Sequence, residues 1–176
     1  MAETQAASAL ASVQLEGNDL ASLPSSLAAC KRLRRINLFR NRFEAIPDVL
    51  ADLPALVALT IGRNKIAVVG AVIGRCRALQ ELDLKENPIT ELSEAIGDLP
   101  ALAHLDLSGA RITRLPDSLG RCALHSLALT KSAVTILPAD LSGWSQLRRV
   151  VLLNTQLHPK ERERLRAAAP DAEIVG

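Results

Sequence analysis

The stretch between positions 104 and 125 contains side chains from which hydrolase active sites are built. A base, an acid and a nucleophile of the Ser–His–Asp kind occur among four residues: His104, Asp106, Ser108 and His125. Two imidazoles and a carboxylate could also bind a metal ion weakly. Either chemistry requires side chains that converge on one point in an enclosed site. The elements that carry these residues therefore decide whether they form a site or a solvated surface.

Three cysteines, Cys30, Cys76 and Cys122, could form a disulfide set, a metal site or a nucleophile. Successive cysteines are 46 residues apart, which puts them in the same slot of a repeating unit, two repeats apart. Two steps between stacked strands span about 10 Å, whereas a disulfide needs Cα atoms within about 7 Å. We therefore expect buried, reduced thiols that act as small hydrophobic side chains, in a reducing compartment.

An internal repeat supplies the elements that position all these residues. Leucines recur at steps of 23 residues, with one step of 22, at Leu10, Leu33, Leu56, Leu79, Leu102, Leu124 and Leu147. Each begins a segment of the form L-x-x-L-x-L-x-x-N-x-L, for example LRRINLFRNRF and LQELDLKENPI. Self-similarity at a period of about 20 to 29 residues is typical of a solenoid.

Over residues 10–157 this pattern resembles the leucine-rich-repeat superfamily, in its 23-residue class whose second half runs L-P-x-x-L-x-x-L, and is similar to bacterial members. Matching second halves begin at Leu23, Ile46, Leu115 and Leu137, whereas Gly70 and Ser93 replace the usual proline in two others. The resemblance implies an α/β fold, a curved right-handed solenoid of seven repeats. A parallel β-sheet would line its concave face, and short helical or 3-10 segments its convex face.

The chain turns at the asparagine position, where a side-chain amide can satisfy backbone groups that the turn leaves open. Asn18, Asn41, Asn64 and Asn87 fill this position. Ala110, Ser132 and Thr155 occupy this position in the later repeats. The two hydroxyl groups can form some of these hydrogen bonds, whereas Ala110 can form none. Because the fifth repeat also contains Gly109 and is shortened to 22 residues, we expect a local distortion there.

The repeats predict three parts: an N-terminal cover at 1–9, seven repeats at 10–157, and a capping helix with an extended tail at 158–176. In the last part Pro159 can open a helix and Pro170 can end it, with Leu165 and Ala168 facing the core. This tail resembles the C-terminal cover of many bacterial repeat proteins, and we expect the chain to be a whole protein.

Composition argues against several classes of function. Of the 176 residues 48% are hydrophobic, which is enough for a continuous core, and the net charge is only +2. Aromatic residues make up 2%, so few rings could stack on exposed bases, and we expect no nucleic-acid partner. The sequence contains neither a signal peptide nor a long apolar run, so we expect no membrane association. We also expect the protein to be a monomer. The cytoplasm, or a host cell reached without a classical signal, is the expected location.

Function must come from the outward-facing strand positions, which change in charge along the solenoid. The second and third repeats predict a basic surface with one exposed aromatic residue, Phe39. The fourth and fifth repeats predict an acidic surface. Aromatic residues with arginines are typical of interface hot spots. The candidate partner-binding residues are Arg35, Asn37, Phe39, Arg40, Thr60, Arg63, Glu81, Asp83, Lys85, His104, Asp106 and Arg149.

Each of these features also has a structural interpretation. Phe39 could pack over neighbouring strands, and charges in equivalent slots, such as Arg63 and Glu86, could pair across the sheet. An apolar patch at Val151 and Leu153 could bind a partner or be covered by the C-terminal segment.

The Ser, His and Asp side chains would project side by side from a regular sheet, without an oxyanion hole or an enclosing pocket. We therefore predict neither an enzyme nor a metal or cofactor site. The predicted function is a non-catalytic protein-interaction module that binds a protein on its concave face, such as a bacterial scaffold or a host-directed effector. The alternative is a substrate-recognition component of an enzyme system, such as a ubiquitin ligase or a GTPase.

Overall fold

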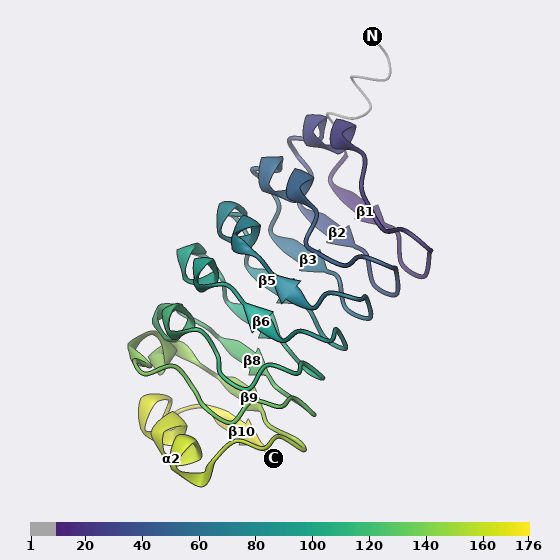
Figure 1. Cartoon of the computed structure of the whole chain (residues 1–176). Coiled ribbons are helices and arrows are strands. Elements are labelled where there is room, and N and C mark those ends of the chain that lie inside the picture. Colours follow the sequence, from purple (N-terminus) through teal and green to yellow (C-terminus); the bar gives the residue numbers. More distant parts are fainter. Residues whose placement is uncertain (1–9) are drawn as a thin grey trace.

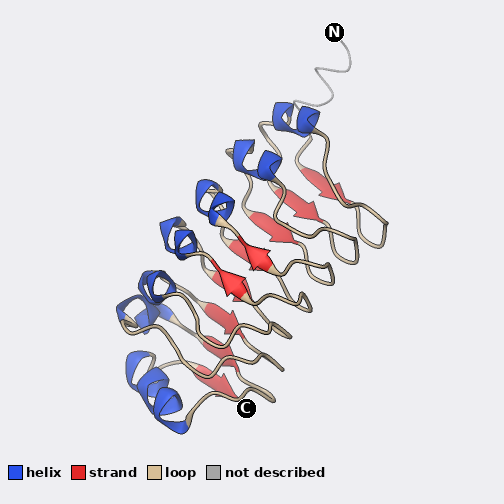
Figure 2. Ribbon diagram, in the orientation of Figure 1, coloured by secondary structure: helices blue, strands red, loops and turns tan. Residues whose placement is uncertain are grey.

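The computed structural model describes residues 10–176, which form a curved stack of parallel strands with helices on the opposite side (Figures 1 and 2). Within this range the main sheet has eight strands, all paired in parallel. In sheet order they are β1 (Ser12–Gln14), β2 (Arg35–Asn37), β3 (Ala58–Thr60), β5 (Glu81–Asp83), β7 (His104–Asp106), β8 (Ser126–Ala128), β9 (Arg149–Val151) and β10 (Glu173–Val175). The predicted solenoid is confirmed, whereas the N-terminal cover at 1–9 lies outside the described residues.

Short 3-10 helices lie on the convex side, as the repeat pattern predicts. They are η1 (Ser25–Ala29), η2 (Asp48–Asp52), η3 (Ala71–Arg75), η4 (Glu94–Asp98), η5 (Asp117–Arg121) and η6 (Ser142–Gln146). A second pairing joins β4 (Val68–Val69) to β6 (Glu91–Leu92). Because each helical turn takes more room than the strand spacing of about 4.8 Å, the stack curves toward its strands.

Each three-residue strand points its middle side chain into the core and the flanking two toward solvent. The middle residues Ile36, Leu59, Leu82 and Leu105 stand in one register row and are at most 2% exposed. The leucines that begin the repeats from Leu33 onward are also buried, but Leu10 is 37% exposed at the N-terminal end of the stack. The core is therefore continuous from one repeat to the next.

The asparagines of the second, third and fourth repeats form the expected ladder. The Asn64 amide donates to the carbonyls of Ile61 in its own repeat and Leu38 in the repeat before, and its oxygen accepts from Phe43 N–H. Asn87 repeats this pattern one step later. Among residues 10–176, the Asn18 side chain bonds only to carbonyls of its own turn, at the exposed end of the stack.

Beyond Asn87 the ladder ends, and the prediction about the hydroxyls is only half right. Thr155 Oγ1 donates to the carbonyl of Leu152 at 2.9 Å, but the buried Ser132 Oγ has no hydrogen-bond partner in the described part of the chain. The serine hydroxyl is shorter than an amide and does not reach the neighbouring repeat. In these repeats the turn closes instead through the backbone, with Ser132 N–H donating to Leu129 O.

The fifth repeat is one residue shorter in the loop that follows its helix, η5, and not at the turn that contains Ala110. Leu33 and Leu79 donate to the cysteine carbonyl three residues earlier, whereas Leu124 N–H donates to Cys122 O two residues earlier. The pairing of β7 with β8 remains in register across this shortened loop. The expected distortion is thus confined to the loop between η5 and β8.

The C-terminal helix α2 (Pro159–Ala168) packs beside η6, and β10 extends the sheet beyond β9. Leu165 is fully buried and Ala168 is half-buried against the core. Strand β10 covers one side of Val151, but Leu153 remains 45% exposed. None of the helices found between residues 10 and 176 has the length and hydrophobicity of a bilayer-spanning segment.

Candidate functional site

The predicted binding residues fall into two groups. Along the concave face they lie in the strands, at Arg35 and Asn37 (β2), Thr60 (β3), Glu81 and Asp83 (β5), His104 and Asp106 (β7) and Arg149 (β9). In the turns that follow strands they are Phe39, Arg40, Arg63 and Lys85. All of these side chains are half-buried or exposed.

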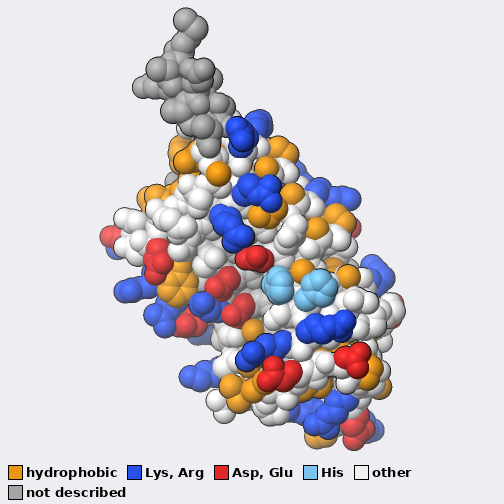
Figure 3. All heavy atoms as spheres, turned by 180° about the vertical axis from the view of Figure 1, so that it is seen from behind, with side chains coloured by type: hydrophobic (Ala, Val, Ile, Leu, Met, Phe, Trp, Pro, Cys, Tyr) orange, Lys and Arg blue, Asp and Glu red, His pale blue; other side chains and the backbone are white. Residues whose placement is uncertain are grey.

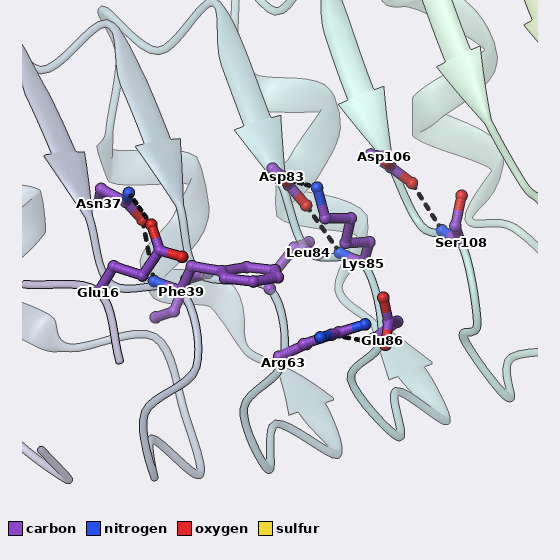
Figure 4. Close-up of polar contacts among 12 residues, drawn as sticks. Glu16, Asn37, Phe39, Arg63, Asp83, Leu84, Lys85, Glu86, Asp106 and Ser108 are labelled. Atoms are coloured by element: carbon purple, nitrogen blue, oxygen red, sulfur yellow. Dashed lines mark hydrogen bonds and ion pairs between the residues drawn. The ribbon is translucent and has the colours of Figure 1, made fainter. Parts of the chain in front are cut away.

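Phe39 is half-buried and not fully exposed, which corrects the sequence prediction. Its ring lies close to two cationic side chains from the next two repeats, with Lys85 Nζ 5.1 Å and Arg63 Cζ 5.5 Å from the ring centroid (Figure 4). Cations over an aromatic face at this distance are attracted by the ring quadrupole. We refer to Phe39, Arg63 and Lys85 as the aromatic cluster.

Carboxylates hold both cations of the aromatic cluster in place. Arg63 Nε donates to Glu86 Oε2 at 2.8 Å, and Lys85 Nζ lies 3.0 Å from Asp83 Oδ2 (Figure 4). The Glu86 hydrogen bond raises the pKa of Arg63, and the Asp83 hydrogen bond raises that of Lys85. The predicted Arg63–Glu86 pair is confirmed, and both cations stay charged at neutral pH.

Gly62 makes room for this arrangement and was missed from the sequence. A Cβ atom added there would lie 3.1 Å from Phe39 Cδ2 and 2.9 Å from the carbonyl oxygen of Lys85. The equivalent slot in neighbouring repeats holds Phe39, Lys85 and Ser108. A glycine in a slot that otherwise carries a side chain was the available signal.

A second missed feature is the backbone of the turn that follows each strand. The residue before the asparagine position has positive φ in all seven described turns: Gly17, Arg40, Arg63, Glu86, Gly109, Lys131 and Asn154. This left-handed conformation costs a non-glycine residue on the order of 1 kcal/mol. It directs the side chains of Arg40, Arg63 and Glu86 outward from the solenoid.

Asp83 and Asp106 also shape the turns. Their Oδ1 atoms accept from the N–H groups of Lys85 and Ser108, at 3.0 and 2.8 Å (Figure 4). Asn37 accepts from Phe39 N–H in the same way at 3.0 Å. A side-chain oxygen closes these three turns whether or not it carries a charge, and the turns after Ala128 and Val151 form without one.

Other predicted residues pair singly or stand apart. Arg35 lies 3.7 Å from Glu81, and Arg149 lies 3.7 Å from Glu173; all four side chains are more than half exposed. Such exposed pairs contribute about 0 to 1 kcal/mol. Arg40 is exposed and has no ion pair within residues 10–176.

The possible triad does not assemble in the described residues. The ring centroids of His104 and His125 are 6.1 Å apart, and Asp106 bonds to the backbone of Ser108. Between residues 10 and 176 no hydrogen bond joins either imidazole to Ser108 or Asp106. Within the same residues, no three His, Cys, Asp or Glu side chains gather in a metal-binding arrangement.

A shallow hollow of about 490 Å³ lies at the middle of the concave face. Its lining includes Thr60, Glu81, Asp83, His104 and Asp106. It is open to solvent on one side, so it can take a side chain or a loop from a macromolecule.

Comparisons with known proteins agree with this geometry. Family models described as leucine-rich repeat match residues 8–66 and 78–99. No curated protein sequence matches significantly. A leucine-rich-repeat protein of Leptospira interrogans is 27% identical over 98% of this chain and 51% of its own, with a TM-score of 0.70.

Two other similar structures are complexes. A plant peptide hormone receptor, RGFR1 with RGF2, is 22% identical with a TM-score of 0.71, over 93% of this chain and 26% of its own. TLR13 with ssRNA13 is 25% identical with a TM-score of 0.81, over 94% and 24% respectively. This chain thus spans about half or less of the length of these proteins.

Leucine-rich-repeat proteins are typically binding modules, commonly for other proteins, without catalysis of their own. The family matches cover predicted repeats one to four, so the count of seven stays a prediction. The repeat pattern, the parallel stack of strands and the family models all indicate leucine-rich repeats. The chain folds as a leucine-rich-repeat solenoid, and family models identify leucine-rich repeats in its residues 8–66 and 78–99.

Proposed function

We propose that this chain binds a protein partner on the concave face of its sheet. The observation that carries the proposal is the aromatic cluster, in which a half-exposed phenylalanine ring lies beside two paired cations at the edge of that face. Aromatic and arginine side chains are enriched in interface hot spots. Asp83, which pairs with Lys85 of the cluster, also lines a hollow into which a partner side chain can fit.

A protein partner agrees with the charge of this face better than a nucleic acid does. Glu81, Asp83 and Asp106 lie at its middle, where they would repel a phosphate backbone. RGFR1 in complex with RGF2 and TLR13 in complex with ssRNA13 show that solenoids of this kind serve in different complexes. Within the proposed function, a bacterial scaffold or a host-directed effector is the role we favour, given the likeness to the Leptospira protein.

The test is a double variant, Phe39→Ser with Arg40→Glu, that removes the ring and reverses a charge. Both replacements already occur in this fold, because Ser108 fills the Phe39 slot and Glu86 fills the Arg40 slot with a φ of 55°. The matched control is Arg77→Glu, which makes the same charge reversal at an exposed residue after η3 on the convex side.

Immobilised protein is used to capture partners from bacterial and host lysates. We expect proteins that are retained by the wild type and by Arg77→Glu but lost from the double variant, whose melting temperature stays within a few degrees. Proteins retained equally by all three, or retention of nucleic acid alone, would contradict the proposal. A large drop in melting temperature would instead assign the aromatic cluster a structural role.

A further inference from the structure

Charges on the concave face are arranged in three bands that follow the strands. Strand β2 and the residue before it carry Arg34 and Arg35, β5 and β7 carry the acidic residues, and β9 with its preceding residue carries Arg148 and Arg149. In Figure 3 basic side chains lie above the acidic ones. Further basic side chains lie below the two neighbouring histidines, on the other side of the acidic ones. The sequence of charges across the sheet is thus basic, acidic, basic.

The hollow lies over the acidic band because of the side chains on either side of it. In the register row that contains Asp83 and Asp106, the next strands carry Thr60 on one side and Ala128 on the other. Beyond them stand Asn37 and Val151, which are not part of the lining of the hollow. The small side chains of Thr60 and Ala128 leave space beside the two carboxylates, and all four residues line the hollow.

Asp106 is the acidic group of this band whose charge is least compensated. Asp83 pairs with Lys85, and Glu81 lies 3.7 Å from Arg35. Asp106 has no ion pair with any residue between 10 and 176, although its Oδ1 accepts from Ser108 N–H.

The fold does not require that charge. Asn37 occupies the same register row as Asp106 and makes the same bond to the backbone two residues later, so a neutral amide is sufficient to close the turn. The local turn therefore does not require the negative charge at Asp106, which acts on Lys85 from beyond ion-pair distance and helps to raise its pKa. A positively charged partner group could pair with this carboxylate directly.

We propose that the concave face takes an extended partner segment that crosses the strands and places a lysine or arginine side chain in the hollow beside Asp106. This inference rests on the proposed function and specifies its partner. Two or three strand steps of about 4.8 Å separate Asp106 from the basic bands, and an extended chain rises about 3.3 Å per residue. Acidic residues about three or four positions from the central basic residue then face Arg149 on one side and Arg35 on the other.

The experiment selects binders to the wild-type protein from a phage-displayed library of random peptides that are long enough to cross from β2 to β9. The affinities of the enriched peptides, made synthetically, are then measured by fluorescence anisotropy. Three variants are compared with the wild type: Asp106→Asn, Asp98→Asn and the double variant at Phe39 and Arg40. Asp98→Asn removes the same charge at an exposed residue of η4 on the convex side.

We expect enriched peptides to share a central basic residue, with acidic residues at the predicted spacing. Asp106→Asn should weaken their binding about tenfold while keeping the melting temperature, and Asp98→Asn should leave the affinity unchanged. Peptides without a basic residue, or equal affinity for Asp106→Asn and the wild type, would overturn the inference. So would preferential binding of a single-stranded RNA oligonucleotide over every peptide, or the absence of any enriched peptide.

The double variant separates this inference from the proposed function. If it loses the selected peptides although they lack a basic residue, the concave face binds protein and only the charge rule is wrong. If it binds them as well as the wild type does, the proposed binding face is wrong too.

Discussion

The ring of Phe39 lies over Gly62, where an added Cβ atom would come within 3.1 Å of ring atom Cδ2. The same Cβ would approach the backbone oxygen of Lys85 to 2.9 Å, so the glycine fits between two neighbouring repeats. The aromatic cluster depends on this gap because Lys85 and Arg63 both reach the ring across it.

Gly62→Ala should therefore destabilise the protein by about 1 to 3 kcal/mol, because backbone must move to relieve the contact. Urea unfolding followed by circular dichroism measures the change. Gly70→Ala is the control, since an added Cβ there meets no atom of residues 10–176 within 4 Å, and it should change stability by less than about 1 kcal/mol. Equal effects of the two substitutions would show that Gly62 is not under steric constraint.

Asn87→Ala should cost about 2 to 3 kcal/mol of stability. Asn87 is 1% exposed, donates to Ile61 O and Leu84 O, and accepts from Ile66 N–H. Its removal leaves buried backbone groups without partners, which is more costly than the loss of an exposed bond. Asn18→Ala, at the exposed end of the ladder, is the control and should cost less. A loss below 1 kcal/mol for Asn87→Ala would indicate that water or backbone replaces the amide.

The reverse change, Ala110→Asn, should stabilise the protein by about 1 kcal/mol. Residue 110 occupies the slot of Asn87 one repeat later, and an amide there could accept from Ile89 N–H as Asn87 accepts from Ile66 N–H. Thermal unfolding of the variant measures the gain. A lower melting temperature would mean that the fifth repeat has closed around the smaller alanine, which is 3% exposed.

The repeat pattern predicted most of the fold because its physical cause is local and repeated. Leucine spacing decides which side chains are buried, and equal repeat lengths decide which residues stand side by side. Arg63 and Glu86 could therefore be paired from their slots alone, and they lie 2.8 Å apart. The buried position of the cysteines follows from the same spacing.

The pattern could not predict contacts that depend on how far a side chain reaches. The ring of Phe39 extends past the next repeat to contact Lys85, two repeats away, because Gly62 has no side chain in between. Ser132 fails to continue the ladder because a hydroxyl group is too short. Glu94 bonds to the backbone of Ser118 at the start of the next helix, a contact that depends on the angle between successive turns.

Acid should weaken the fold through carboxylates that accept backbone hydrogen bonds. Bonds from Ser118 lower the pKa of Glu94, and a bond from Ala139 N–H lowers that of Asp117. A lowered folded-state pKa gives stability that is present above the unfolded pKa of about 4 and is lost as pH falls through the folded value. Melting temperature should thus be nearly constant from neutral pH to about pH 5 and fall below about pH 4.

Glu94→Gln tests the assignment, because glutamine keeps one acceptor oxygen but carries no charge. The variant should melt lower than the wild type at pH 7, and the difference should shrink as pH falls and Glu94 itself becomes protonated. Glu91→Gln, at an exposed residue of β6, is the control. A Glu94→Gln difference that stays the same from pH 7 to pH 3 would contradict the proposed role of the charge.

The three thiols should be unreactive in the folded protein. Cys30, Cys76 and Cys122 are at most 6% exposed, and burial raises the pKa of Cys76 to about 11, so little thiolate is present at pH 8. A thiol reagent such as dithionitrobenzoate should label them only as fast as the protein opens, and should label all three in urea. Ser12→Cys, at an exposed residue of β1, adds a thiol that should react at once in the folded state. Rapid labelling of a native cysteine without urea would place that thiol at the surface and contradict the packing of the convex side.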